Sequence, residues 1–573
     1  RDCLLSRGLG DVYKRQSLLG CLLISCNENS WLKEKPLDFY TAENSYKTTS
    51  QFRQSLNYLY DVVRDLHWNI GDQHIVMWCG DIGYGGTDPD NKFNNFQTFL
   101  TPNTYVAGSF WDRGFTAIAN SNVILNRLKL PNEVSESDKQ AIRGEALFFR
   151  AYFYNFLGNL FGGVPLILEE PIEERRDYVR ASRQDVYQQA CNDLEEACTL
   201  LKDITEVKDG VISRQAALHL LSEIYISLKN YPKAIEAASE VIDHPAMALM
   251  KQRFGSRKDH EGSPYWDLFQ ANNQNRSSGN TETIWALQYE YQNTGSSYGC
   301  MMPRYILSSY TSLQVKSKEA GKNVLAFTTF TEEKGGRGIG VIHPSDHFLK
   351  DIWEKDGTND YRNSSQMIAR DFRIDNEDAA GYGQWVVKDG WLEEEHKMRN
   401  FYPHVLKFSR IGDLPDDCYT KNADGSNKLT PLGEHYLAYV WGGVVANASL
   451  KDEYMYRLAG TYLLRAEAYL ANGEVDKATA DLNTIRIRSN ATPAEESEVN
   501  LDYILDEQLR ELYFEDFRLT TLCRLGKVVE RSKAYNPYGY NVGEHQNLFP
   551  IPYSEVEKNI YATLEQNPGY EGF

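Results

Sequence analysis

Two glutamates near the C-terminus are the pair whose spacing most resembles that of catalytic carboxylates. Glu511 and Glu515 are four residues apart and Arg518 follows three residues later, so on a helix all three would share one face. Hydrolysis of a glycosidic bond needs two carboxyl groups on either side of a sugar ring at a set separation. Carboxylates on adjacent turns of one helix, with an arginine beside them, suit an ion-paired structural network instead. We therefore predict no catalytic residue in this pair.

The histidine-containing motifs give little support for a metal site. His343 and His347 enclose a proline, and His396 ends a run of three glutamates that is typical of an exposed charged stretch. The nine cysteines show no CxxC pair and no zinc spacing. HExxH and the P-loop do not occur in the sequence, and neither GxSxG nor GxGxxG stands in the strand-turn-helix context that its chemistry needs. The sequence therefore predicts no metal ion, no cofactor, and cysteines that are free and mostly buried.

Aromatic and planar polar side chains are mixed in three stretches that lack helical periodicity. The first is a long loop over 67–91, the second follows a strand predicted at 283–289, and the third covers 382–391 with Trp385 and Trp391. Long aromatic loops on a helical scaffold are commonly functional. Candidate recognition residues from the first two loops are Trp78, Asp81, Tyr84, Tyr291, Asn293, Tyr298, Arg304 and Tyr305.

The elements that would position these loops are helices that repeat one pattern. A small residue is followed by Tyr three positions later and by Ala nine positions after that, which is the spacing of a tetratricopeptide helical hairpin. Small residues let paired helices approach closely. We therefore predict a mostly helical fold built on such hairpins. The matching positions are Ser222, Tyr225 and Ala234 in one copy and Ala466, Tyr469 and Ala478 in the other.

Between the two copies the chain changes character. Over about 245–450, Gly, Asn, Ser and Tyr become frequent and helical periodicity fades. Insertions on one face of a repeat scaffold often carry the binding site. We predict a single domain over 27–573, with helical repeats at about 50–244 and 453–526 and a loop-rich insertion that carries short strands.

Composition narrows the possible ligands. The chain of 573 residues has a formal net charge of −19 and a pI near 5.2, which argues against nucleic-acid binding, because phosphate contacts need a basic surface. It contains 37 Tyr, 24 Phe and 10 Trp. Most of these rings belong in a core of this size, yet their number leaves room for an aromatic recognition surface.

The N-terminal stretch divides into two parts. Residues 1–16 fit nothing that follows and are interpreted as a non-native, adapter-derived segment. Residues 17–26 are interpreted as the end of a lipoprotein signal peptide, with an apolar run too short to span a membrane. Cys26 is the preferred lipidation site because a polar tether follows it, and Cys21 is the alternative.

A series of short motifs follows Cys26 along the chain: RAYFY at 150–154, FGGVP at 161–165, SRQAA at 213–217, RAEAY at 465–469, ELYFE at 511–515, LFPIP at 548–552 and NPGY at 567–570. Each motif is weak alone, but their order and spacing are specific. Through them nearly the whole chain resembles the SusD/RagB family of nutrient-uptake outer-membrane lipoproteins. One departure is Leu519-Thr520-Thr521, where relatives often have an aromatic residue and an Asp.

The resemblance implies a SusD-like, mostly α fold and a non-catalytic, lipid-anchored protein at the cell surface. It implies that the protein captures oligosaccharide and delivers it to a SusC-like TonB-dependent outer-membrane transporter. Sugars need flat aromatic faces for their C–H surfaces and planar polar groups for their hydroxyls, which the candidate loops supply. Two alternatives stay open: capture of a peptide, as in some relatives, or a structural lid on the transporter with little ligand affinity of its own.

Overall fold

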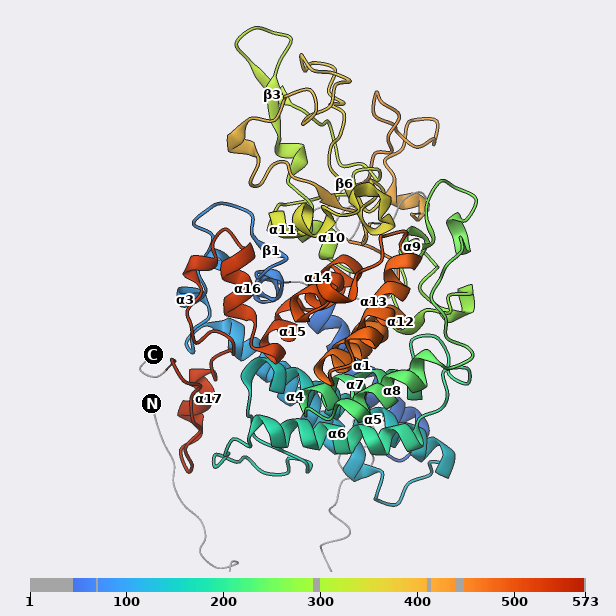
Figure 1. Ribbon diagram of the computed structural model, residues 1–573, viewed down its shortest axis with the longest axis vertical. Helices are drawn as coiled ribbons and strands as arrows, with labels where there is room; N and C mark the ends of the chain where they lie inside the picture. The colour runs from blue at the N-terminus through green and yellow to red at the C-terminus, as the bar shows by residue number, and fades with distance from the viewer. Residues whose placement is uncertain (1–44, 69–70, 292–298, 410–413, 439–447, 571–573) are drawn as a thin grey trace, which may run out of the picture.

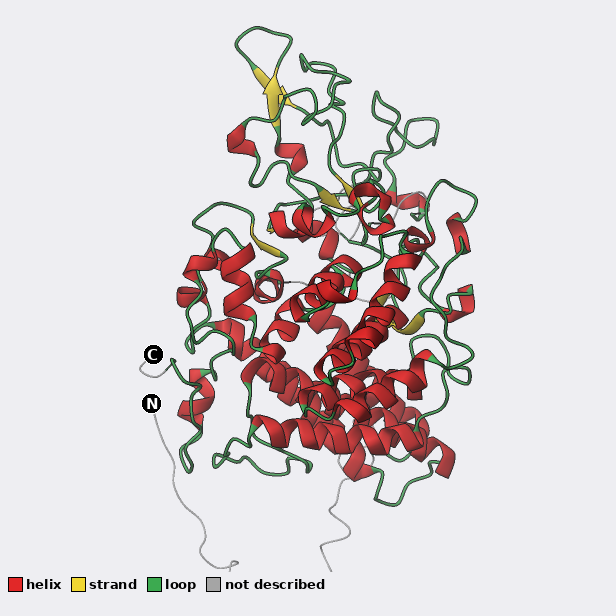
Figure 2. Cartoon of the chain, viewed as in Figure 1, coloured by secondary structure: helices red, strands yellow, loops and turns green. Residues whose placement is uncertain are grey.

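A computed structural model describes residues 45–68, 71–291, 299–409, 414–438 and 448–570 of the chain. The predicted adapter segment, the signal peptide and both candidate lipidation cysteines lie outside the described residues. Helices form a large body, and a region poor in regular structure lies at one end of it (Figures 1 and 2). Among the described residues, no helix combines the length and the apolar character needed to cross a membrane.

The N-terminal half of the body consists of antiparallel helices around α5, whose C-terminal two-thirds is almost fully buried. Serines begin three of these helices by accepting a hydrogen bond from a backbone N–H of the first turn, namely Ser135, Ser182 and Ser213. The helices are α1 (Thr49–Trp68), α2 (Asp72–Ile75), α3 (Phe96–Phe99), α4 (Tyr105–Arg127), α5 (Glu136–Phe161), α6 (Arg183–Leu200), α7 (Arg214–Ser227) and α8 (Tyr231–Ile242).

The predicted hairpins are present, and α8 of the first packs against α12 of the second. The small residues Ser222, Ala234, Ala466 and Ala478 are all buried, as close helix pairing requires. Gly473 ends α12 with a φ of 83°. The C-terminal helices are α12 (Leu458–Ala471), α13 (Val475–Arg488), α14 (Leu501–Leu512), α15 (Arg518–Leu525), α16 (Val528–Tyr535) and α17 (Tyr553–Lys558). The mostly helical fold class is therefore confirmed.

Short strands form four two-stranded antiparallel sheets, and the strand predicted at 283–289 is β2. The sheets are β1 (Gly83–Gly85) with β5 (Ile342–Pro344), β2 (Thr283–Leu287) with β8 (Glu453–Arg457), β3 (Gln314–Lys316) with β4 (Asn323–Leu325), and β6 (Ile368–Ala369) with β7 (His404–Val405). Three short helices lie among them: α9 (Pro264–Asp267), α10 (Met302–Ile306) and α11 (Asp346–Leu349). The insertion has a small hydrophobic core of its own.

Glu511 and Glu515 belong to a buried ion-pair network, as predicted. They do not share one helix face, because α14 ends at Leu512 and Glu515 lies in the turn after it. Arg457 donates to both, with closest distances of 2.9 Å to Glu511 and 2.6 Å to Glu515. Arg518 does not join them and pairs with Asp81 instead. Because Arg457 belongs to β8, its ion pairs with the two glutamates hold α14 and the turn after it against this strand.

Candidate functional site

The segment 339–344 brings together two of the predicted recognition loops. On one side β5 pairs with β1, so that Tyr84 lies opposite His343, and the N–H of Gly86 donates to Val341 O at 2.8 Å. On the other side the N–H of Val341 donates to Tyr305 O at 3.2 Å. Tyr84 and Tyr305, far apart in the sequence, therefore flank one extended segment.

Two glycines allow β1 to lie this close to β5. A Cβ at Gly83 would come within 2.9 Å of His343 O, and a Cβ at Gly86 would come within 3.0 Å of Gly340 O. Both contacts are with backbone oxygen atoms, which cannot move aside as a side chain can. Glycine is therefore required here for close approach of two backbones.

Four rings meet at this sheet, and we call them the aromatic cluster: Tyr84, His343, Tyr402 and Tyr538. Tyr84 stacks on His343 with ring centroids 4.7 Å apart and touches Tyr538 edge-on at 5.5 Å. His343 and Tyr402 are buried beneath, whereas Tyr84 and Tyr538 are partly exposed. Burial lowers the pKa of His343, so its ring stays neutral and supports Tyr84 as a flat stacking partner.

Arg304 and Tyr305 add a polar group beside a ring. Both side chains are partly exposed, and the Arg304 guanidinium lies 5.8 Å from the Tyr305 ring centroid. The Nε of Arg304 is buried and has no hydrogen-bond partner among the described residues. A guanidinium with unused donors can bind hydroxyl or carboxylate oxygens of a ligand.

For two predicted recognition residues the prediction was wrong. Trp78 is only 1% exposed, because it lies on a buried 3₁₀ turn (Val76–Trp78) and packs edge-on against Phe517 at 5.2 Å. Asp81 is fully buried and accepts hydrogen bonds from Arg518 and Arg531 at 2.7 and 2.6 Å. Burial alone would raise the pKa of Asp81, but the two guanidinium groups hold it well below its usual range. Neither side chain is free to contact a ligand.

The other predicted residues lie elsewhere or outside the described residues. Tyr291 donates its hydroxyl to Asp417 Oδ2 at 2.7 Å. Asn293 and Tyr298 lie outside the described residues. In the third loop, Arg373 stacks on Trp385 at 5.2 Å, and the indole N–H of Trp391 donates to Gln384 Oε1 at 2.7 Å. These residues stay predictions.

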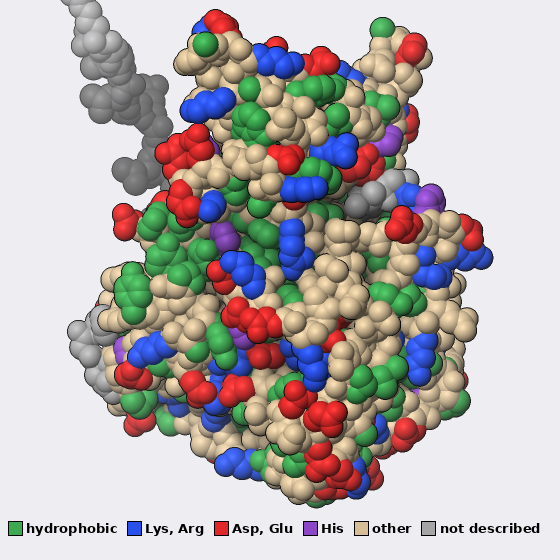
Figure 3. Space-filling view, turned by 45° about the horizontal axis from the view of Figure 1, so that its top comes forward, with side chains coloured by type: hydrophobic (Ala, Val, Ile, Leu, Met, Phe, Trp, Pro, Cys, Tyr) green, Lys and Arg blue, Asp and Glu red, His purple; other side chains and the backbone are tan. Residues whose placement is uncertain are grey.

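Sequence reasoning missed three members of the aromatic cluster, because they come from segments far apart in the chain. His343 was considered only as a metal ligand, and Tyr402 stands in no recognisable pattern. Tyr538 could have been found, since NPYGY over 536–540 has the same mixture of aromatic and turn residues as the predicted loops. Figure 3 shows hydrophobic side chains gathered on the surface below the insertion.

Two groups of carboxylates and a histidine place their ligand atoms within 4.8 Å of one another. In the first group, His435 Nδ1 is 2.7 Å from Glu333 Oε1, so an ordinary hydrogen-bonded pair accounts for the contact. In the second group, around His396, the glutamates are exposed to solvent. Neither group by itself indicates a bound metal. The groups are Glu332, Glu333 and His435, and Glu393, Glu395 and His396.

A second surface of the helical body exposes apolar side chains. The segments 168–179 and 553–561 lie side by side, because the N–H of Tyr561 donates to Arg176 O at 2.9 Å and the N–H of Tyr178 donates to Asn559 Oδ1 at 2.7 Å. An open groove of about 620 Å³ runs between them and α4. We call this the apolar face. Its exposed large apolar side chains are Leu168, Ile172, Val179, Tyr553, Ile560 and Tyr561.

Family models match most of the chain. A model described as "SusD family" matches residues 281–570, and one described as "Starch-binding associating with outer membrane" matches residues 86–226. SusD-like protein P2 of Formosa agariphila is 25% identical over 568 residues, which cover 96% of this chain and 97% of that protein. SusD-like protein P25 of the same organism is 23% identical and covers 95% of this chain and 97% of its own length.

Solved structures share the fold. A laminarin-binding SusD-like protein superposes with a TM-score of 0.65 at 23% identity, covering 92% of this chain and all of that chain. Surface glycan-binding protein A from Bacteroides thetaiotaomicron, in complex with laminarihexaose, gives a TM-score of 0.63 at 18% identity and covers 91% of this chain and all of that chain. Both likenesses extend over the helical body and the insertion.

Proposed function

The chain belongs to the SusD family of surface glycan-binding proteins, and on that premise we propose that it captures an oligosaccharide and delivers it to a partner SusC-like TonB-dependent outer-membrane transporter. Members of the family associate with the outer membrane and are binding proteins, not enzymes. We further propose that the protein is held at the cell surface by a lipid on Cys26, with Cys21 as the alternative.

The observation that carries the proposal is the juxtaposition of Tyr84 with Arg304 and Tyr305 across the segment 339–344. A partly exposed ring held flat by a buried histidine suits the C–H face of a pyranose. A partly exposed guanidinium, on the other side of the segment, suits hydroxyl oxygens. Of the eight predicted residues, these three are our ligand contacts. Tyr291, Asn293 and Tyr298 remain candidate ligand contacts.

Delivery to a transporter requires a surface for a protein partner, and we assign that role to the apolar face. Exposed apolar patches on soluble domains commonly mark protein–protein contacts. The groove within the face is rimmed by charges of both signs, including Asp112, Glu174, Arg175 and Lys558, which could fix the orientation of a partner.

Two alternatives predict different behaviour of the isolated protein. A peptide-capturing member of the family would bind peptides at the same surface, and the net charge of −19 would favour neutral or cationic ones. A structural lid would show no ligand affinity by itself and would still be needed for uptake by the transporter.

The test is calorimetry on the soluble protein starting after Cys26, with a panel of oligosaccharides and peptides. Laminarihexaose is the first probe, because two relatives of the same fold bind laminarin or laminarihexaose. We expect Tyr84→Ala to weaken binding about tenfold, the loss expected when an aromatic contact worth about 1.4 kcal/mol is removed. Arg304→Ala should weaken binding as well, whereas the exposed tyrosine of α1 provides a control in Tyr58→Ala.

The possible outcomes distinguish glycan capture from peptide capture and from a structural lid. Glycan binding that is indifferent to Tyr84→Ala and Arg304→Ala would keep the function and discard this site. Binding of peptides alone would replace glycan capture with peptide capture. A folded protein that binds no member of the panel would support the structural lid and overturn ligand capture.

A further inference from the structure

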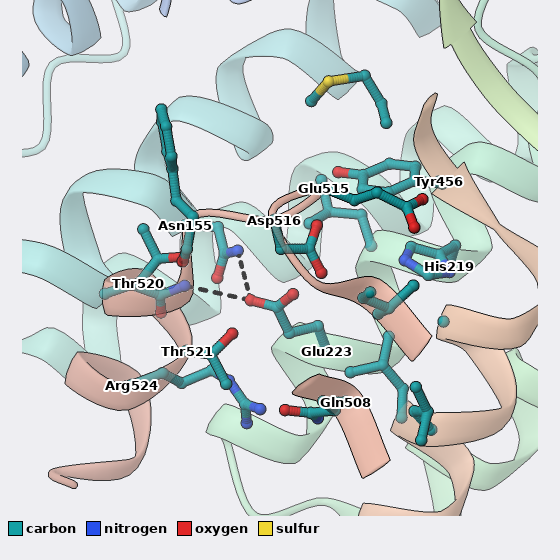
Figure 4. A pocket seen from close by; sticks show the side chains of 18 of the residues that line it. Asn155, His219, Glu223, Tyr456, Gln508, Glu515, Asp516, Thr520, Thr521 and Arg524 are labelled. Atoms are coloured by element: carbon teal, nitrogen blue, oxygen red, sulfur yellow. Dashed lines mark hydrogen bonds between the residues drawn. The ribbon is translucent and has the colours of Figure 1, made fainter. Parts of the chain in front are cut away.

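Every buried arginine and lysine among the described residues is paired with a carboxylate. The same pairing is found around the cavity of about 110 Å³ between α5, α7 and the turn before α15 (Figure 4). There Arg524 binds Glu467 through two hydrogen bonds of 2.7 Å. This cavity holds about three or four water molecules, at roughly 30 Å³ each, and has no room for a sugar.

Two arginines beside the aromatic cluster have no such partner. The Nε of Arg304 is buried, yet its guanidinium has neither an ion pair nor a hydrogen bond to a described residue. Arg399 is exposed and likewise has no ion pair to a described residue. Both contact the first residue of the segment 339–344, because the N–H of Ile339 donates to Arg304 O at 3.0 Å and Arg399 Nε donates to Ile339 O at 3.4 Å. Two positive charges therefore flank one residue.

Arg399 is held at the aromatic cluster by its neighbours in the chain. Met398, directly before it, has its Sδ 3.9 Å from the hydroxyl of Tyr538. Tyr402, three residues after it, packs on His343 with ring centroids 4.3 Å apart. The hydrogen bond of its own Nε fixes the side chain further, whereas its two terminal nitrogens have no partner among the described residues. The charged end of Arg399 is therefore placed at the cluster and open to a ligand.

The acids close to this surface do not balance the two arginines. Asp88 and Asp90 are exposed and lie near Tyr538, after β1, whereas Arg304 lies on the other side of the segment 339–344. Other nearby acids have cations of their own. These pairs are Asp346 with Lys350 and Glu394 with Lys397.

The net charge of −19 does not exclude an anionic ligand at this surface. At physiological ionic strength, charges more than about 8 Å apart are largely screened, so the nearest charges decide. A guanidinium binds carboxylate and sulfate oxygens more strongly than hydroxyl oxygens, because both partners are charged and its N–H donors match the spacing of two oxygens. A neutral sugar would leave the charge of both arginines unbalanced.

Building on the proposed capture of an oligosaccharide, we propose that the ligand is an anionic oligosaccharide. Arg304 and Arg399 bind an oxyanion group of the sugar, either the carboxylate of a uronate or a sulfate ester, while a neighbouring sugar ring lies on Tyr84. Arg399, which sequence reasoning did not single out, thereby becomes a residue that determines specificity.

The test is calorimetry on the soluble protein with matched pairs of oligosaccharides. Uronate oligosaccharides, such as oligogalacturonate, are compared with their carboxyl-reduced forms, and sulfated oligosaccharides, such as sulfated laminarihexaose, with the unsulfated forms. We expect the anionic member of a pair to bind at least about tenfold more tightly. A preference within the first kind of pair identifies a carboxylate, and a preference within the second identifies a sulfate. Raising NaCl from about 0.05 M to about 0.5 M should reduce the preference.

Variants assign the preference to the two arginines. Arg399→Gln should reduce the preference for the anionic member about tenfold, and because the side chain is exposed the Tm should stay that of the natural protein. Tyr84→Ala should weaken both members of a pair equally, since the ring contacts the sugar and not its charge. Arg373→Gln is the matched control, because Arg373 is also exposed and lies 5.2 Å from the ring of Trp385 in the third loop.

Three results would overturn the proposal. Neutral members that bind as tightly as anionic ones would overturn the anionic class and leave glycan capture intact. A preference that survives Arg304→Gln combined with Arg399→Gln, or that is lost in Arg373→Gln, would place the anion elsewhere. A folded protein that binds no member of any pair would overturn glycan capture as well, so failure of this inference is distinguishable from failure of the proposed function.

Discussion

Trp78 and Tyr84 are close in the sequence but differ in exposure: Trp78 is buried and Tyr84 is partly exposed. Trp78 is covered by Phe517 at the start of α15, whereas Tyr84 lies on a short strand and keeps one side partly exposed. The residue types in this loop indicated that rings and acids are candidates for ligand contacts. They could not show which ring a helix more than 400 residues later would cover. The supporting rings of His343 and Tyr402 could not be predicted for the same reason.

Asp81 should report on acid stability. Its pKa is depressed in the folded state, so its ion pairs stabilise the protein above the unfolded value of about 3.9 and are lost as the pH falls below it. We expect Asp81→Asn to lower the free energy of unfolding by about 3–5 kcal/mol at pH 7, because it leaves two buried arginines short of charge. Urea unfolding at several pH values is the measurement.

The difference between Asp81→Asn and the natural protein should shrink as the pH is lowered from 5 to 2. Glu236→Gln, on the exposed side of α8, serves as the control and should stay within about 0.5 kcal/mol at every pH. A difference that stays constant across this range would mean that Asp81 is not ionised in the folded protein.

At the scale of elements, the helices were predictable and the small sheets mostly were not. The hairpins α7–α8 and α12–α13 follow from spacings that repeat within a few turns, and such local signals survive in any context. The strand β2 was predicted from a run of β-forming residues. In contrast, β1 and β5 are three residues each and exist only because they meet, so neither carries a periodic pattern.

The contact between α4 and α5 provides a test of close helix packing. A Cβ at Gly114 would come within 2.8 Å of the Leu157 side chain, so Gly114→Ala should lower the free energy of unfolding by about 1–3 kcal/mol. Gly108 lies on the same helix with its nearest contact at 4.0 Å, so Gly108→Ala should be neutral or stabilise by up to about 1 kcal/mol. Denaturant unfolding of both variants makes the comparison, and equal effects would refute the packing argument.

At the scale of the whole molecule, the described residues have two hydrophobic cores of unequal size. The large core joins the two sets of helices, and the small one lies within the insertion around Tyr310, Phe327 and Ile374. A small core with few regular hydrogen bonds opens at a lower free energy than helices buried on all sides. The insertion should therefore unfold locally before the helical body does.

Hydrogen–deuterium exchange followed by mass spectrometry tests this order. We expect amides over 313–327 and 372–386 to exchange faster than those of α5, and to be the first to lose protection in low urea. Amides of α12 provide a second reference within the body. Loss of protection at one common urea concentration would mean that both cores unfold as a single unit.

The pairing of β2 with β8 has a consequence for the history of the molecule. The insertion leaves the body at one strand and returns at its partner, so its two ends are tied together whatever lies between them. Closing a loop costs entropy that grows only with the logarithm of its length, about 0.6 kcal/mol for each doubling. The stretch between these strands can therefore be lengthened, shortened or exchanged at small thermodynamic expense. Related chains that keep this strand pair can change the insertion, and with it the ligand that is bound, without changes in the helical body.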